Sequence, residues 1–346
     1  MMQQSMWPEI SRLIKKAVID CSGSSLLADA TVSIIGVVGI LSLILVFALI
    51  LVYMERKVCA FMQMRFGPNR LGPYGIFQTI ADTLKLMTKE EIKPAQVSSI
   101  MWALAPILLF MAAMTTYAVI PFDAGLVLAD LNIGIFFFFA VGSQATLTML
   151  MAGWSSNNKL SLIGGMRAVA QMLSYEIPLV FSVLGVVMIA GSMKMTDIVK
   201  AQEGMWFILS QPVAFVIYMI AATAETNRTP FDLVECESEL VAGPFTEYSG
   251  MRWSYFFMAE YASMVAASCV AATLFLGGWH GPWLPGWVWF FIKVFAMIFV
   301  FMWFRWTFPR LRVDQLMSFG WRILLPLSLV NIIVTGIGLW LFFPLG

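Results

Sequence analysis

Carboxylates within apolar sequence are the residues of this chain most able to do chemistry. Glu176, Glu225 and Glu260 each stand in, or at the end of, a long apolar stretch. A charged residue at the centre of a membrane helix costs about 2.5–3.5 kcal/mol, and such groups usually face a wet cavity or a partner. We therefore expect these glutamates to take part in proton-linked chemistry. The alternative is a structural pair with a neighbouring subunit or with Arg167 or Lys293, and Lys293 by itself fits either role.

A strongly acidic segment, residues 225–260, contains two of these glutamates. It holds seven acidic residues against two basic ones, Arg228 and Arg252. Clustered carboxylates repel one another, so some of them should hold a proton at neutral pH, and coupled groups of this kind can pass protons. A solvated loop is the alternative, but apolar residues interleaved among the acids favour packing instead. The seven acidic residues are Glu225, Asp232, Glu235, Glu237, Glu239, Glu247 and Glu260.

The segment 55–93 combines charged residues with fixed turns. Glycine and proline recur between positions 67 and 75, which argues for turns there. From position 76 to 90, apolar residues repeat at helical spacing opposite polar ones, which predicts an amphipathic helix in the membrane interface. We expect Arg56, Asp82 and Lys85 to face a cavity at the membrane surface. A surface-lying connector with solvated charges is the alternative, and spacing alone favours it.

Cysteine and histidine are too few and too scattered for a local metal site. Cys21, Cys59, Cys236 and Cys269 lie far apart with no CxxC pair, and His280 is the single histidine. Zinc and iron–sulfur sites depend on clustered ligands of these types. We expect no metal centre in this chain, and we interpret His280 as a loop residue without a catalytic role.

Composition places the chain in the membrane. Of its 346 residues, 60% are hydrophobic and only 12% are charged, against about 25% charged in soluble globular proteins. The mean hydropathy is +0.84. A soluble enzyme is therefore excluded, and the net charge of +1 argues against a nucleic-acid partner.

Long apolar runs predict an all-α integral membrane protein with about eight transmembrane helices. Each run is near the 20 residues needed to cross the hydrocarbon core. We expect one polytopic domain, residues 30–346, after an N-terminal segment, 1–29, with a possible surface helix at 7–19. The expected spans lie near 30–54, 98–121, 130–153, 161–190, 205–225, 253–277, 286–308 and 323–343.

Basic residues predict the orientation of these spans. Fourteen lysines and arginines fall in the loops after the first, third, fifth and seventh spans, and five fall on the opposite face. Basic residues are enriched in cytoplasmic loops. We therefore expect those four loops in the cytoplasm and both termini outside.

Three segments resemble the H subunit family of NADH:quinone oxidoreductase, respiratory complex I. The similar residues of the first loop are Glu55-Arg56-Lys57, Gln63, Arg65, Gly67-Pro68-Asn69-Arg70, Gly72-Pro73, Gly75, Gln78, Ala81-Asp82 and Lys85-Leu86. Those of the acidic segment are residues 224–233, Glu235, residues 237–243 and residues 247–250, and those of the last loop are residues 314–317, Trp321 and residues 325–327. Thr79 and Val234 depart from the pattern, where proline is expected.

The resemblance implies a membrane subunit that helps to enclose a quinone tunnel. It makes Arg56, Gln63, Arg65, Asp82 and Lys85 tunnel or near-tunnel residues. It assigns proton coupling to Glu176, Glu225, Glu235, Glu237, Glu239, Glu247 and Glu260. Ubiquinone or menaquinone would be the substrate, and FMN and iron–sulfur clusters would belong to partner subunits.

The resemblance also implies partners and a location. The partners are peripheral-arm iron–sulfur and quinone-site subunits on the cytoplasmic face, and small and antiporter-like subunits within the bilayer. The location is the bacterial cytoplasmic, or inner, membrane. Two alternatives stay open: the related subunit of a membrane-bound hydrogenase or formate-hydrogenlyase complex, and a free-standing ion-coupled transporter.

Overall fold

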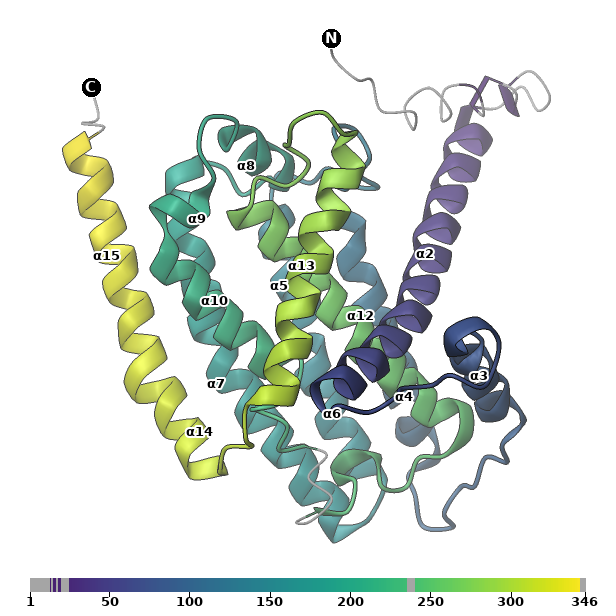
Figure 1. Ribbon diagram of the computed structural model, residues 1–346. Coiled ribbons are helices and arrows are strands. Elements are labelled where there is room, and N and C mark those ends of the chain that lie inside the picture. Colours follow the sequence, from purple (N-terminus) through teal and green to yellow (C-terminus); the bar gives the residue numbers. More distant parts are fainter. Residues whose placement is uncertain (1–12, 14, 17, 20–24, 235–239, 343–346) are drawn as a thin grey trace.

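Helices make up the regular structure of the described residues, which are 13, 15, 16, 18, 19, 25–234 and 240–342 of a computed structural model (Figure 1). The expected all-α class is confirmed. The expected surface helix at 7–19 lies largely outside the described residues. The α-helices are α2 (Ser25–Met62), α3 (Gln78–Thr88), α4 (Ser99–Thr115), α5 (Gly134–Gly142), α6 (Gln144–Ser155), α7 (Lys159–Ala190), α8 (Met195–Ala201), α9 (Phe207–Ser210), α10 (Pro212–Glu225), α12 (Gly250–Phe275), α13 (Gly286–Thr307), α14 (Val313–Phe319) and α15 (Leu325–Phe342).

Seven helical segments of the described chain are long and apolar enough to cross a membrane. They match seven of the eight expected spans. The remaining one, 205–225, is divided into α9 and α10 at Gln211-Pro212. Proline has no N–H to donate and is tolerated at the start of a helix. The 14 residues of α10 reach only about 21 Å at 1.5 Å per residue, so the span depends on both pieces.

The bundle has two opposite ends (Figure 1). We call them the α3 end, which also holds α14 and the connection from α10 to α12, and the α8 end. The first residue of α2 and the last of α15 lie at the α8 end. The predicted amphipathic helix is α3, which packs against α2 and α12. Its apolar residues Ile80, Leu84 and Met87 are exposed, as expected for a helix in the membrane interface.

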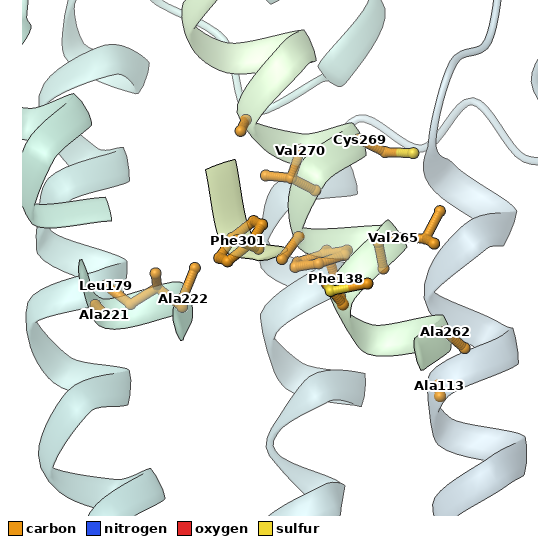
Figure 2. Packing of buried hydrophobic residues seen from close by; sticks show 14 of the residues in the cluster. Ala113, Phe138, Leu179, Ala221, Ala222, Ala262, Val265, Cys269, Val270 and Phe301 are labelled. Atoms are coloured by element: carbon orange, nitrogen blue, oxygen red, sulfur yellow. The ribbon is translucent and has the colours of Figure 1, made fainter. Parts of the chain in front are cut away.

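Helix α12 is the centre of the core. Small residues let the neighbouring helices approach it closely, and Figure 2 shows Ala113 of α4 beside Ala262 of α12. Two buried tyrosines donate hydrogen bonds to its backbone carbonyls: Tyr117 to Ala262 at 2.6 Å and Tyr218 to Ala267 at 2.8 Å. Buried tyrosine hydroxyls need such partners. The contacts fix the height and rotation of α12, which carries two of the site residues described below.

Candidate functional site

Five residues from four segments meet at the α3 end of the bundle. We call them the charged cluster: Glu55 of α2, Arg228 after α10, Glu260 and Tyr261 of α12, and Arg305 of α13. Glu55 Oε2 accepts hydrogen bonds from Arg228 Nη1 at 3.0 Å and from the Tyr261 hydroxyl at 2.7 Å. Its other oxygen, Oε1, pairs with Arg305 Nη1. Arg228 Nε lies 2.9 Å from Glu260 Oε1, so a single guanidinium contacts two carboxylates.

Burial makes the pairing within this cluster obligatory. Arg228 is 2% exposed and Glu55 is 5% exposed. An unpaired buried charge is strongly unfavourable. Burial alone disfavours the charged form of Arg228, but Glu260 and Glu55 outweigh burial and raise its pKa above the ordinary arginine value. The ring of Tyr261 adds a cation–π contact, with Arg228 Cζ 4.4 Å from its centroid. Arg228 therefore stays positively charged at any physiological pH.

A cavity of about 520 Å³ opens beside the cluster, and we call it the basic cavity. Glu55, Tyr261 and Arg305 line it together with two predicted tunnel residues, Arg56 and Arg65. The apolar part of its wall comes from Val52, Phe66, Pro68, Phe257 and Trp306. Apolar walls with a few convergent polar groups are typical of sites for small organic ligands.

The other predicted tunnel residues lie around this cavity rather than in its wall. Gln63 accepts a hydrogen bond from Arg65 Nε at 2.7 Å. Asp82 forms an ion pair with Arg56, and Lys85 Nζ lies 3.7 Å from Asp82 on the exposed side of α3. The contacts form two groups, Gln63–Arg65 and Arg56–Asp82–Lys85, and each group has one arginine in the wall of the basic cavity.

A second, smaller cavity lies deeper in the bundle. This inner cavity has a volume of about 80 Å³ and is lined by Glu225, Glu260 and Asn227, among others. Since one buried water occupies roughly 10–30 Å³, it has room for a few water molecules. Glu176 and Glu225 interact electrostatically. Two predicted proton-coupling residues, Glu225 and Glu260, therefore share the inner cavity, and a third, Glu176, interacts with one of them.

The remaining acidic residues belong to the connection between α10 and α12. Asp232 pairs with Arg310 Nη2 at 3.0 Å, and Glu247 accepts a hydrogen bond from Asn158 at 2.7 Å. This connection is pressed against α7: a Cβ on Gly164 would lie 2.6 Å from the Cα of Gly243. Glu235, Glu237 and Glu239 lie outside the described residues. The solvated-loop alternative does not fit Asp232, which is buried.

The two basic residues expected within spans differ in position. Arg167 is half-buried on α7. Lys293 of α13 is buried near the α8 end, where its Nζ donates to the carbonyl oxygens of Gly278 at 2.9 Å and His280 at 2.7 Å. Its Nζ also lies 4.7 Å from the centroid of the Trp206 ring. These contacts of Lys293 hold the connection between α12 and α13 in place and include no carboxylate.

Sequence reasoning missed Glu55, Tyr261, Arg305 and the pairing of Arg228. The only sequence signal for Glu55 and Arg305 is their position at the ends of apolar runs. A charge in such a position is either exposed to solvent or buried against the end of another span, and the local sequence does not distinguish these two environments. Among the described residues, no group of three or more His, Cys, Asp or Glu side chains is arranged to hold a metal ion.

Comparisons with known proteins agree with this architecture. A family described as NADH dehydrogenase matches residues 35–336. The chain is 52% identical over 321 residues to the H subunit of NADH-quinone oxidoreductase from Carboxydothermus hydrogenoformans, covering 92% of each chain. It is 52% identical over 303 residues to the H subunit from Geobacillus kaustophilus, covering 86% of this chain and 91% of that one. An H subunit from Geobacter metallireducens is 49% identical over 317 residues, with 89% and 96% covered.

Proposed function

The chain belongs to the NADH dehydrogenase family, among the H subunits of NADH-quinone oxidoreductase, and from this premise we propose that its basic cavity receives the quinone and that its buried carboxylates couple quinone reduction to proton translocation. It is a multi-pass membrane subunit of bacterial complex I. The carrying observation is the basic cavity itself, which opens at the α3 end beside the charged cluster.

The wall of the basic cavity suits a quinone. A quinone headgroup offers two carbonyl oxygens that accept hydrogen bonds, and Arg56, Arg65 and Arg305 supply guanidinium donors around the cavity. Phe66, Phe257 and Trp306 offer aromatic surface for the ring. The electrons come from a donor outside this chain. The residues of this chain bind and orient the headgroup and bring charge close to it.

Charge placed in the basic cavity acts directly on the cluster. Reduction makes the quinone anionic until it takes up protons, and Arg305 and Tyr261 face that change. In a low-dielectric site a unit charge interacts strongly with its neighbours. Glu260 and Glu225 line the inner cavity and Glu176 interacts electrostatically with Glu225, so a change at the headgroup reaches carboxylates that are able to exchange protons.

Quinone binding is tested by labelling the intact complex with a photoreactive quinone analogue. We expect label on peptides from residues 52–68 or 257–261, and excess quinone should suppress it. Label found elsewhere in the chain, with none on these peptides, would contradict the assignment of the basic cavity.

Coupling is tested with Glu225→Gln and Glu260→Gln. We expect the complex to assemble, with proton translocation per electron lowered more than quinone reduction. Glu203→Gln, at an exposed residue of the α8 end, is the control. Normal values of both activities in both assembled variants would exclude the proton-coupling role.

The orientation is a separate part of the proposal. We place the α3 end in the cytoplasm, where it meets the peripheral iron–sulfur subunits, and both termini outside, as the basic residues predict. Reporter fusions at each terminus and in the 226–249 connection test it. A cytoplasmic reporter signal from either terminus would reverse the orientation.

A further inference from the structure

The side chain of Arg228 links residues that line the two cavities. Glu55 and Tyr261 line the basic cavity, and Glu260 lines the inner cavity. Glu260 and Tyr261 are consecutive residues of α12, so the helix presents neighbouring side chains to different cavities. Arg228 lines neither cavity, yet it contacts a carboxylate of each: Glu55 Oε2 at 3.0 Å and Glu260 Oε1 at 2.9 Å.

The two contacts of Arg228 are unequal. Nη1 donates a well-aligned hydrogen bond to Glu55. Nε lies within ion-pair distance of Glu260 but lacks hydrogen-bond alignment. Its Nη2 is buried and has no hydrogen-bond partner in the part of the chain that the structure describes. The guanidinium therefore has donor capacity left over, and a small shift would strengthen one carboxylate contact at the expense of the other.

We propose that Arg228 is the positioning residue that transmits the charge of the basic cavity to Glu260, an inference that rests on the proposed function. An anionic quinone draws Arg305 away from Glu55. Glu55 then keeps Arg228 as its remaining cation, beside the Tyr261 hydroxyl, and Arg228 moves toward it. Glu260 loses its counterion, and the Glu260 carboxylate takes up a proton delivered through the inner cavity, which has room for a few water molecules. Protonation of the quinone returns Arg305 to Glu55 and Arg228 to Glu260, which releases that proton.

The charged groups around Arg228 support this sequence of events. Glu55 comes from α2 and Glu260 from α12; Arg305 of α13 pairs with Glu55 and also interacts electrostatically with Glu260, so its withdrawal weakens the charged form of both carboxylates. Asp232 also interacts electrostatically with Glu260, but it has its own partner in Arg310. Arg228 is thus the described cation that two carboxylates on different cavities share, and neither can lose it without a compensating charge.

The test is Arg228→Lys in the intact complex, with Arg252→Lys as its matched control. Arg252 also pairs with a carboxylate, Glu91, at 3.0 Å and lies over an aromatic ring, Trp102, at 4.2 Å, but it lines neither cavity. Lysine keeps the charge but places it and its donors on a single nitrogen, which lacks the rigid fork by which a guanidinium reaches two carboxylates. We expect assembly and quinone reduction to persist in both variants. Protons translocated per electron should fall to about half or less in Arg228→Lys only, a loss of coupling between linked sites.

Glu55→Gln provides a second measurement if Arg228→Lys does not assemble. It removes the cavity-side carboxylate from Arg228 and should lower the same ratio. An infrared difference spectrum of quinone reduction should also lose a carboxyl band that Glu260→Gln removes. A ratio equal to that of Arg252→Lys in assembled Arg228→Lys or Glu55→Gln would overturn the inference. If Glu260→Gln is the only variant that lowers the ratio, the proposed function holds and the role of Arg228 is excluded. If no variant lowers the ratio, the proposed function and the role of Arg228 are both excluded.

Discussion

Two buried cations, Arg228 at the α3 end and Lys293 near the α8 end, show opposite uses of a positive charge. Both are almost fully buried, at 2% and 5% exposure. Arg228 is held by carboxylates from two helices, whereas Lys293 is held by two backbone carbonyls and an aromatic ring. A carboxylate can change its charge and a carbonyl cannot. Burial of a charge therefore does not identify a coupling residue; the chemistry of its partners does.

The largest expected effect comes from removing the shared carboxylate of the α3 end. Glu55→Ala leaves Arg228 and Arg305 without their common partner, and breaking a buried pair costs about 3–5 kcal/mol. We expect little assembled complex and a sharply lower thermal inactivation temperature. Glu91→Ala, which breaks the exposed pair with Arg252, is the control and should cost about 0–1 kcal/mol. Equal losses from the two substitutions would contradict the burial argument.

Removing the cation near the α8 end should affect stability but not coupling. Lys293→Met leaves the carbonyls of Gly278 and His280 without their donor, at about 1–3 kcal/mol for each group that stays buried. We expect a lower inactivation temperature and an unchanged number of protons translocated per electron. A lowered ratio at normal quinone reduction would show that Lys293 belongs to the coupling path and would remove the contrast with Arg228.

A smaller effect is expected from Tyr261→Phe. The substitution keeps the ring beneath Arg228 but removes the 2.7 Å hydrogen bond to Glu55. A hydrogen bond to a charged group contributes about 1.5–3 kcal/mol, and Glu55 keeps both arginines. We expect normal assembly with slower quinone reduction, measured as turnover against quinone concentration. Tyr255→Phe on the same helix is the control; slowing by both alike would point to a general effect on α12.

The smallest effect concerns acid sensitivity at the α8 end. Burial lowers the pKa of His280 from its ordinary 6.5; Lys293 reinforces that direction and Glu203 opposes it. The unfolded chain therefore binds this proton first, and the stability contributed by neutral His280 is lost as pH falls below about 6.5. His280→Gln should retain more stability at acidic pH than the parent, relative to neutral pH, in inactivation curves. Identical curves would exclude a role for this imidazole.

Local sequence patterns predicted most of the helices correctly. The apolar runs predicted about eight spans, seven of which correspond to long helical segments of the described residues, and the helical spacing of apolar residues at 76–90 predicted α3. The division of the span at 205–225 was missed because the run is apolar on average, while the polar side chain of Gln211 at the break finds its partners on a distant helix. Gln211 Nε2 donates a hydrogen bond to Thr335 at 2.7 Å, and Gln211 Oε1 accepts one from Asn331 Nδ2 at 3.0 Å, both on α15. A break in a membrane helix is tolerated where neighbouring helices satisfy it.

The candidate site was only partly predictable. Glu225 and Glu260 were identified because a charge in apolar sequence is conspicuous, Arg56 because it belongs to a charged loop beside a predicted amphipathic helix, and Arg65 only through the family resemblance. Glu55 stands next to Arg56 and has the same local signal, yet one side chain is buried in a salt-bridge network and the other is exposed. Helical rotation about α2 separates them, and it is set by packing rather than by composition.

Hydropathy, charge bias and motif residues thus established the membrane class, the span positions and the family from the chain read in order. Each of these properties depends on the types of residues that are close together in the sequence, so each can be evaluated without knowing the folded structure. Which charges share a cavity was decided only when helices far apart in sequence came together. Glu55 meets Arg228 across 173 residues and Tyr261 across 206. Electrostatic pairing depends on distance in space and on local dielectric, and neither is defined until the bundle is packed.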